Sequence, residues 1–260
     1  MALRLGLPLI GRFSQGKQQS MPVPAAQLAQ FQQEAAAIGP LQVDQVAIPG
    51  TAASYEITRP ADFDALLDSA ADDPQQNLPY WAELWPSGIA LAAALITAPE
   101  PQAGLRALEL GCGLGVTAIA ALQRGMSLLA TDYSHEALAL CALNTARNAG
   151  RTPMARQLNW REPDQAFLQI AGEGFPLVLA ADVLYEARDV EPLRELVDHI
   201  VAPDGALWLA EPGRAPARRF VEEMVSSGWR DTVSTCAGQW PDPEDNAKGV
   251  VVQVHRLMRG

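Results

Sequence analysis

The sequence predicts an α/β protein whose main part is a doubly wound, mostly parallel sheet of seven strands, preceded by a small N-terminal α+β extension. From Pro86 onward, short apolar segments alternate with helical segments, which is typical of a parallel sheet covered by helices on both faces. Glycines and polar side chains gather where the apolar segments end, at the sheet edge where such folds bind ligands. The chain has 260 residues, 48% of them hydrophobic, so it can bury one sizeable core.

The extension is assigned to residues 1–77 and the main domain to residues 78–260. Residues 1–21 are expected to be flexible. A helix is predicted over residues 24–38, because Ala, Leu, Gln and Glu dominate there and a Gly-Pro pair ends it. Two strands and a short helix are predicted next, over residues 41–49, 53–58 and 62–69.

Helices and strands then alternate through the main domain. One helix has clear boundaries: Ser134 is a typical N-cap, and Gly150 suits the left-handed position that closes a helix. The other predicted helices cover residues 87–97, 116–124, 190–201 and 215–227. The predicted strands cover residues 105–110, 127–131, 156–160, 176–181, 206–210, 229–234 and 250–257.

The charge balance disfavours nucleic acid as a partner. The formal net charge is -11 and the pI is about 4.7, so the chain repels a phosphate backbone on average. Arg214, Arg218 and Arg219 form a candidate basic patch, but a solvated helix face is the favoured interpretation of this trio.

The cysteines and histidines predict neither disulfides nor a metal site. Cys112, Cys141 and Cys236 are far apart and odd in number, which fits a reducing compartment.

No apolar run approaches the ~20 residues of a membrane span. The first 33 residues contain no acid and loosely resemble an organelle presequence, but a cytoplasmic protein is the favoured expectation.

The sequence from Glu109 to Gly115 predicts a ligand-binding turn between a strand and a helix. Its three glycines, Gly111, Gly113 and Gly115, allow a tight turn and close approach of the backbone to a ligand. A dinucleotide fingerprint places its third glycine where Val116 stands here, and Glu109 would repel a pyrophosphate. S-adenosylmethionine, which carries a sulfonium and an ammonium, tolerates such an acid, so we expect it as the cofactor, with no metal.

Polar residues at the ends of the next strands extend the predicted cofactor site. Asp132 lies 17 residues after Gly115, where a carboxylate can accept from both ribose hydroxyls; the alternative is an acid at a helix N-terminus. Asn159 and Trp160 end the third predicted strand and can bind an adenine ring, although such a tryptophan is often core. The set is completed by neighbours of these positions: Cys112, Tyr133 and Ala181.

Several motifs together resemble the seven-β-strand protein lysine methyltransferases. They are the segment Pro79–Gly88 with its two tryptophans, the glycine turn with Asp132, Asn159-Trp160, and Asp182-Val183-Leu184-Tyr185 as an Asp-x-x-Tyr motif. Glu211-Pro212-Gly213-Arg214 is most similar to the branch that contains the electron transfer flavoprotein β-subunit lysine methyltransferase, whose members show Asp-Pro-Gly-Arg there. The resemblance covers roughly residues 78–220.

The resemblance implies a Rossmann-like methyltransferase sheet and a role for each motif. Trp85 would lie against the cofactor, and Asp182 would face the methyl donor and the incoming amine. Trp81 and Glu211 would contact the substrate, a protein that presents a lysine. Asn159 stands where the family commonly has an acid, and Glu211 where the nearest branch has an aspartate.

A lysine must lose its proton before it can accept a methyl group, and an acid beside it raises its pKa. We therefore expect Asp182 to orient the amine, while desolvation by Trp81, Trp85 and Tyr185 favours its neutral form. Tyr185 is expected on the same side of a helical turn as Asp182. The alternative is a strand-end acid that caps the next segment, beside a packing tyrosine.

Three alternatives and one surface stay open. The chain can be a methyltransferase for a small molecule or another protein side chain, or a non-catalytic binding protein; a dehydrogenase is disfavoured by Val116 and Glu109. Residues 239–246 can form an acidic rim beside the acceptor mouth or simply a solvated loop.

Overall fold

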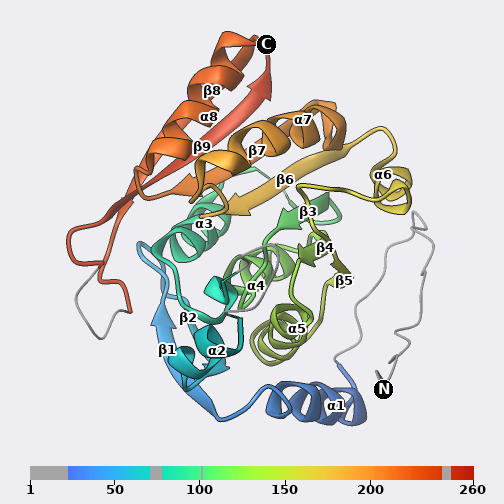
Figure 1. The fold of residues 1–260 in the computed structure, drawn as a ribbon, viewed down its shortest axis with the longest axis vertical. Coiled ribbons are helices and arrows are strands. Elements are labelled where there is room, and N and C mark those ends of the chain that lie inside the picture. The colour runs from blue at the N-terminus through green and yellow to red at the C-terminus, as the bar shows by residue number, and fades with distance from the viewer. Residues whose placement is uncertain (1–22, 71–77, 101, 242–246) are drawn as a thin grey trace.

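The computed structural model describes residues 23–70, 78–100, 102–241 and 247–260 (Figure 1). The expected flexibility of residues 1–21 and residues 242–246 of the predicted acidic rim lie outside the described residues.

The predicted seven-stranded sheet is confirmed. Its strand order is β5-β4-β3-β6-β7-β9-β8, and β9 pairs antiparallel with both β7 and β8 while the other pairs are parallel. The strands are β3 (Arg106–Leu110), β4 (Ser127–Asp132), β5 (Met154–Gln157), β6 (Phe175–Ala181), β7 (Val201–Glu211), β8 (Trp229–Ala237) and β9 (Val251–Arg259). The chain runs outward from β3 to β5 and then returns to β6, so a topological switch point lies between β3 and β6.

Helices cover both faces of the sheet and form two apolar clusters (Figure 1). On one face pack α3 (Pro86–Thr97), α4 (Val116–Gln123) and α5 (His135–Ala149). On the other pack α6 (Gln165–Ala171), α7 (Val190–Ile200) and α8 (Ala215–Ser226). Because both faces are covered, the inner strand β6 contains a continuous apolar run, Leu177–Ala180, all of which are buried.

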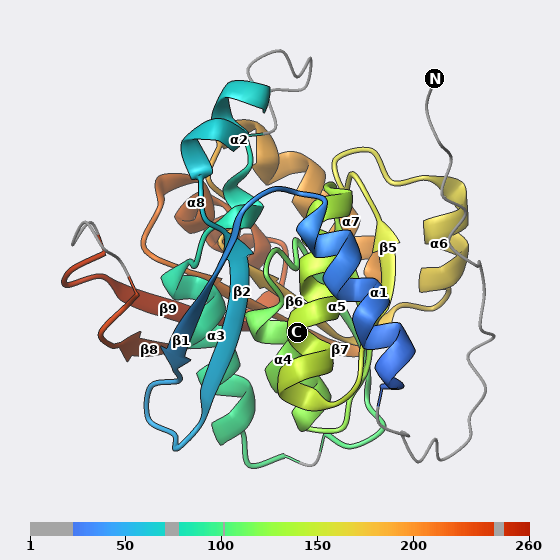
Figure 2. The ribbon, with the colours of Figure 1, turned by 90° about the horizontal axis from the view of Figure 1, so that it is seen from below.

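The N-terminal segment packs against the α5 side of the sheet. It contains α1 (Ala25–Ala36), the antiparallel hairpin of β1 (Leu41–Ala47) and β2 (Ser54–Pro60), and α2 (Phe63–Ala70). Figure 2 shows α1 alongside α5, and these helices are in direct contact. Buried side chains of the hairpin, such as Tyr55 and Ile57, join the same apolar cluster as α3 to α5. The division at residue 77 stays a prediction.

Asn144 of α5 joins the hairpin to the glycine turn. Its Oδ1 accepts from the Thr58 N–H at 2.8 Å, and its Nδ2 donates to the carbonyls of Thr58 at 3.0 Å and of Leu114 at 2.9 Å. The side chain is fully buried, so these bonds satisfy polar groups that water cannot reach. The hairpin is thereby fixed to the turn that the sequence places at the ligand site.

The main differences from the sequence predictions concern three elements. Strand β5 ends at Gln157, so Asn159 and Trp160 lie in the turn after it; β5 is an edge strand that pairs only with β4, and Gln157 is its last paired residue. Helix α6 was not predicted; Asp164 caps it by accepting from the Phe167 N–H. Strand β7 begins at Val201, five residues before its predicted start.

Candidate functional site

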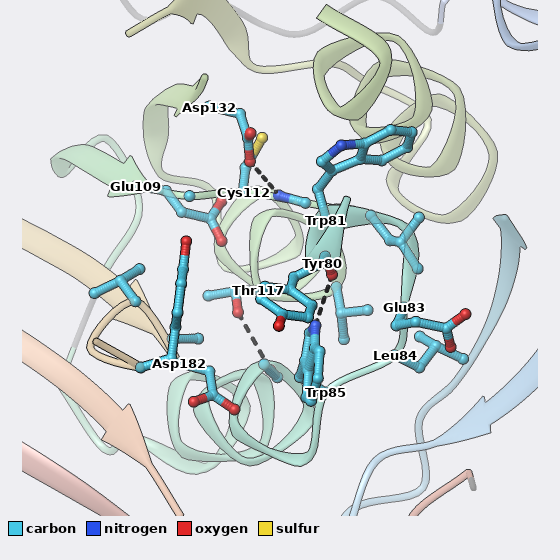
Figure 3. A pocket seen from close by; sticks show the side chains of 18 of the residues that line it. Tyr80, Trp81, Glu83, Leu84, Trp85, Glu109, Cys112, Thr117, Asp132 and Asp182 are labelled. Atoms are coloured by element: carbon cyan, nitrogen blue, oxygen red, sulfur yellow. Dashed lines mark hydrogen bonds between the residues drawn. The ribbon is translucent and has the colours of Figure 1, made fainter. Parts of the chain in front are cut away.

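A cavity lies at the switch point, where β3, β4 and β6 end (Figure 3). The turn after β3 forms its floor, and residues 80–85, which precede α3, form one wall. Its lining residues are Tyr80, Trp81, Glu83, Leu84, Trp85, Gly88, Glu109, Gly111, Cys112, Gly113, Leu114, Val116, Thr117, Asp132, Tyr133, Trp160, Ala181, Asp182, Val183 and Tyr185.

The glycine turn holds backbone conformations that other residues resist. Gly113 has φ 47°, and a Cβ there would lie 3.4 Å from the Trp81 carbonyl oxygen across the cavity wall. Gly115 has φ 82° and is the N-cap of α4, with the Sγ of Cys141 2.9 Å from where its Cβ would be. The turn therefore brings its backbone against both the wall and α5, and it leaves the N-terminal N–H groups of α4 at the cavity.

Asp132 ends β4 with its carboxylate at the cavity. It accepts from the Gly113 N–H at 2.9 Å and from the Ser134 N–H at 3.1 Å. Burial raises the pKa of Asp132 to about 6, although the backbone donors act to lower it. The residue is 3% exposed, so its remaining acceptor capacity is directed at the cavity.

Glu109 is a buried acid without a full set of partners. It is 3% exposed, and its Oε2 has no hydrogen-bond partner among the described residues. Burial, reinforced by the charge of Asp132, raises the pKa of Glu109 well above its usual value, although Thr117 acts to lower it. A buried, unpartnered carboxyl that lines a cavity favours a cationic or hydrogen-bond-donating ligand there.

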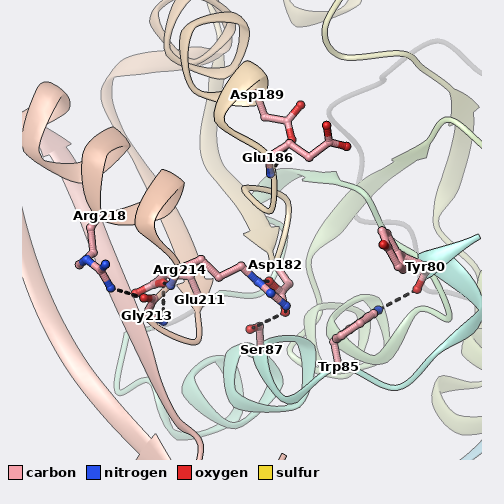
Figure 4. A network of polar contacts seen from close by, with 10 residues as sticks. All are labelled: Tyr80, Trp85, Ser87, Asp182, Glu186, Asp189, Glu211, Gly213, Arg214 and Arg218. Carbon is pink, nitrogen blue, oxygen red and sulfur yellow. Dashed lines mark hydrogen bonds and ion pairs between the residues drawn. The ribbon is translucent and has the colours of Figure 1, made fainter. Parts of the chain in front are cut away.

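Asp182 follows β6 on the opposite side of the cavity from Asp132 (Figure 3). Its φ of 54° is the only positive value of a non-glycine among the described residues, and such strain is stored most often at functional sites. Its Oδ1 accepts from Nε of Arg214 at 2.8 Å, and its Oδ2 lies 3.4 Å from Oγ of Ser87 (Figure 4). Because the backbone at Asp182 is left-handed and residues 183–185 are irregular, the predicted helical turn over Asp182–Tyr185 is wrong.

Three aromatic rings form a wall of the cavity near Asp182. The ring of Tyr80 meets those of Trp85 and Tyr185 edge to face, with centroids 5.9 Å and 5.4 Å apart. The Trp85 indole N–H donates to the Tyr80 carbonyl at 2.7 Å, which fixes the indole against the wall. Burial raises the pKa of Tyr185 above its usual value.

The structure brings most of the predicted site residues to this cavity. Beyond those already described, Trp81, Cys112, Tyr133, Trp160 and Ala181 line it. Tyr133 is held by its hydroxyl, which donates to the Leu78 carbonyl at 2.6 Å. Their individual roles stay predictions.

Three predicted residues lie outside the lining: Gly115, Asn159 and Glu211. Gly115 packs beneath the turn against Cys141, and Asn159 turns its side chain back to the Arg161 N–H. Glu211, predicted to contact substrate, is 1% exposed and instead accepts from the N–H groups of Gly213 at 2.6 Å and Arg214 at 2.9 Å.

Glu211 also takes part in a buried charge cluster. Its Oε1 lies 3.8 Å from Nε2 of His255, whose Nδ1 lies 2.7 Å from Oδ2 of Asp231. Burial lowers the pKa of His255, but the two carboxylates outweigh this effect and raise it overall.

Arg214 was not predicted as a site residue. The interpretation of Arg214, Arg218 and Arg219 as one solvated face is wrong for Arg214, whose guanidinium pairs with Asp182. Arg218 bonds to the Gly213 carbonyl and Arg219 to Glu223, so the trio forms no common patch. The sequence feature that could have identified Arg214 is its position three residues after the end of a strand, at the edge where ligands bind.

Among the described residues, no group of three His, Cys, Asp or Glu side chains is arranged to hold a metal ion. Within the same part of the chain, no helix is long and apolar enough to cross a membrane.

Known proteins of similar sequence and structure carry methyltransferase names. The electron transfer flavoprotein beta subunit lysine methyltransferase of Danio rerio is 32% identical over 143 residues, which are 53% of this chain and 51% of that protein. Its Xenopus laevis counterpart is 34% identical over 164 residues, 59% of this chain and 63% of that protein. The chain thus spans about half to under two thirds of the length of these relatives.

A solved structure shows the same fold. A proposed RNA methyltransferase of Pyrococcus horikoshii aligns with a TM-score of 0.53 and 16% identity, covering 75% of this chain and 96% of that one. The family model described as lysine methyltransferase matches residues 75–226, which is more than half of the chain and includes the whole cavity lining. The chain belongs to the lysine methyltransferase family.

Proposed function

We propose that the chain is an S-adenosylmethionine-dependent methyltransferase that modifies a lysine side chain of a protein. One observation carries this proposal: a single cavity joins the glycine turn and two buried acids to an aromatic wall beside Asp182. When bound, S-adenosylmethionine supplies an electrophilic methyl group on a sulfonium. Family membership and the names of the zebrafish and frog relatives support a lysine as the acceptor.

The residues on the β3–β4 side fit this cofactor. Glu109 offers a buried carboxyl oxygen, Oε2, without a partner among the described residues, which suits the ammonium of the methionine moiety. Asp132 keeps acceptor capacity for ribose hydroxyls after its two backbone bonds. Trp160 supplies a flat apolar surface for adenine, and the turn at Gly111–Gly113 allows the backbone to approach closely.

The residues on the Asp182 side orient the acceptor and exclude water. The rings of Tyr80, Trp85 and Tyr185 give an apolar wall, and desolvation by such a wall favours the neutral amine over the ammonium ion. Asp182 and the Tyr185 hydroxyl can hold the amine by hydrogen bonds. Holding nitrogen and methyl carbon in line near 3–3.5 Å supplies much of the rate in such displacements.

We also propose a protein partner rather than nucleic acid or a membrane, and a cytoplasmic location. The net charge of -11 supports a protein partner, because an acidic protein repels phosphate-rich surfaces on average.

The competing functions are methyl transfer to a small molecule and cofactor binding without catalysis.

Transfer of radiolabel separates these functions. Purified protein is incubated with methyl-labelled S-adenosylmethionine and either a cell extract or the isolated electron transfer flavoprotein β-subunit. The β-subunit is chosen as an acceptor because the zebrafish and frog relatives are named for its methylation. A labelled protein band supports the proposal. Label confined to small molecules favours the first competitor, and cofactor binding without any transfer favours the second.

An Asp182→Ala variant tests the acceptor side within the same assay. Transfer should be lost, while binding of S-adenosylhomocysteine, measured by calorimetry, should survive because the side chain of Asp182 bonds to Ser87 and Arg214 and not to the glycine turn. Normal transfer by the variant would show that Asp182 does not act on the acceptor.

A further inference from the structure

The proposed function leaves one charged contact of the cavity unexplained, the ion pair of Asp182 with Arg214 (Figure 4). Nε and Nη2 of Arg214 lie 2.8 Å and 3.4 Å from the two carboxylate oxygens. The Asp182 side chain is 7% exposed and that of Arg214 38% exposed, so the pair closes the carboxylate off while one side of the guanidinium reaches solvent. Asp182 therefore does not present a bare negative charge to the cavity.

The backbone around Arg214 is built to hold this pair. Glu211 accepts from the N–H groups of Gly213 and Arg214, and Arg214 is the N-cap of α8. The guanidinium carbon lies 5.9 Å from the Trp85 ring centroid, within reach of a cation–π contact. The end of β7, the start of α8 and the Trp85 indole thus hold the guanidinium on the same side of the cavity as the aromatic wall.

The pair changes what Asp182 does to an incoming amine. An unpaired carboxylate raises the pKa of a nearby amine and stabilises the ammonium ion, which has no lone pair for methyl transfer. A guanidinium at hydrogen-bond distance from that carboxylate offsets this attraction. The carboxylate oxygens retain lone pairs that can accept an N–H of a neutral amine.

We propose that Arg214 is a positioning residue that holds Asp182 as a closed ion pair, so that the acceptor side of the cavity selects the neutral amine over the ammonium ion. This inference rests on the proposed function, because it concerns the same acceptor site. Arg214 acts through Asp182 and need not touch the transferred methyl group.

Two small amines of similar shape test the charge preference directly. Ethylamine is an ammonium ion at pH 7.5, whereas 2,2,2-trifluoroethylamine is mostly neutral at that pH. Each is titrated by ligand-observed NMR into protein saturated with S-adenosylhomocysteine. The measured quantity is the ratio of the two dissociation constants, compared between variants so that the different apolarity of the probes cancels.

Arg214→Met should shift this ratio toward ethylammonium by about tenfold to a hundredfold, the size expected for removing one charge several ångströms away in a half-buried site. Arg214→Lys keeps the charge and should retain most of the wild-type ratio. Arg219→Met removes an equal charge from the exposed face of α8, where Arg219 pairs with Glu223, and should leave the ratio unchanged. Arg214→Gln replaces the methionine variant if that one does not fold.

A ratio that is the same in wild type and Arg214→Met overturns the inference and leaves the proposed function intact, provided that S-adenosylhomocysteine still binds. Wild-type protein that does not bind S-adenosylhomocysteine overturns the proposed function, and this inference with it. An equal shift in Arg219→Met would mean that net charge, and not the ion pair, sets the preference, which also overturns it.

Discussion

Replacing Gly115 with alanine tests whether the glycine turn depends on close packing as well as on backbone conformation. At φ 82° an added Cβ would lie 2.9 Å from Sγ and 3.0 Å from Cα of Cys141. Forcing alanine into the left-handed region costs roughly 1–2 kcal/mol. Overpacking against a backbone atom that cannot rotate away adds about 1–3 kcal/mol. We therefore expect Gly115→Ala to lower the free energy of unfolding by about 2–5 kcal/mol.

Gly150→Ala is the matched control. Gly150 closes α5 at φ 67°, and an added Cβ there meets nothing within 4 Å. This variant should lose only the conformational part, roughly 1–2 kcal/mol. Urea unfolding of both variants gives the difference.

The two variants should also differ in ligand binding. The Gly115 N–H donates to the Cys112 carbonyl at 2.8 Å, so moving Gly115 disturbs the cavity floor. Calorimetry should show weaker S-adenosylhomocysteine binding for Gly115→Ala and unchanged binding for Gly150→Ala. Equal losses of stability and equal affinities would refute the packing argument.

Three further predictions follow from buried polar groups. Because the pKa of Asp132 is about 6, lowering the pH from 8 to 5 should weaken S-adenosylhomocysteine binding about tenfold as the carboxylate becomes protonated, and this dependence should be smaller in Asp132→Asn, where Glu109 is the one of the two acids left to titrate; calorimetry across pH checks it. Asn144→Ala leaves buried groups of Thr58 and Leu114 unpaired and should lower the free energy of unfolding, measured in urea, by about 2–4 kcal/mol. It should also weaken S-adenosylhomocysteine binding, and an unchanged affinity for this ligand would contradict the link between the hairpin and the glycine turn. The pKa of His255 is raised in the folded state, so its contribution to stability is fully present below pH 6.5 and is lost as pH rises through the folded value; His255→Gln should therefore destabilise the protein more at pH 6 than at pH 9, and an equal loss at both would contradict the assignment.

The sheet and its ligand-binding edge were predictable because local signals agree with one another. Apolar strands such as β3 and β6 are buried on both faces and lack alternation, and Ser134 and Gly150 mark the ends of α5. These features are short-range, so a single sequence carries them. The cavity floor followed because the ends of parallel strands meet at one edge of the sheet.

The misplaced elements are those that depend on partners far away in the sequence. Strand β5 is an edge strand whose end is decided by pairing with Asp132, and not by its own sequence. Helix α6 has seven residues and too little periodicity to be recognised, although Asp164 was a readable cap. Tyr80 and Thr117 reach the cavity only through the tertiary arrangement.

The charged contacts were the least predictable part of the site. The side chain of Glu211 curls back onto the N–H groups that follow it instead of reaching the cavity. Arg214 and Asp182 are 32 residues apart, and their ion pair depends on adjacent strands β6 and β7 ending side by side. Neither composition nor helix periodicity indicates a contact between residues so far apart in the sequence.

Mass spectrometry of an acceptor treated with trideuteriomethyl S-adenosylmethionine tests the central claim most directly. The isolated electron transfer flavoprotein β-subunit and the proteins of a cell extract are digested, and the site of each deuterated methyl group is located. The proposed function predicts label on lysine side chains with wild-type protein and none with Asp182→Ala. Label on another side chain or only on small molecules, or no label despite cofactor binding, would contradict it.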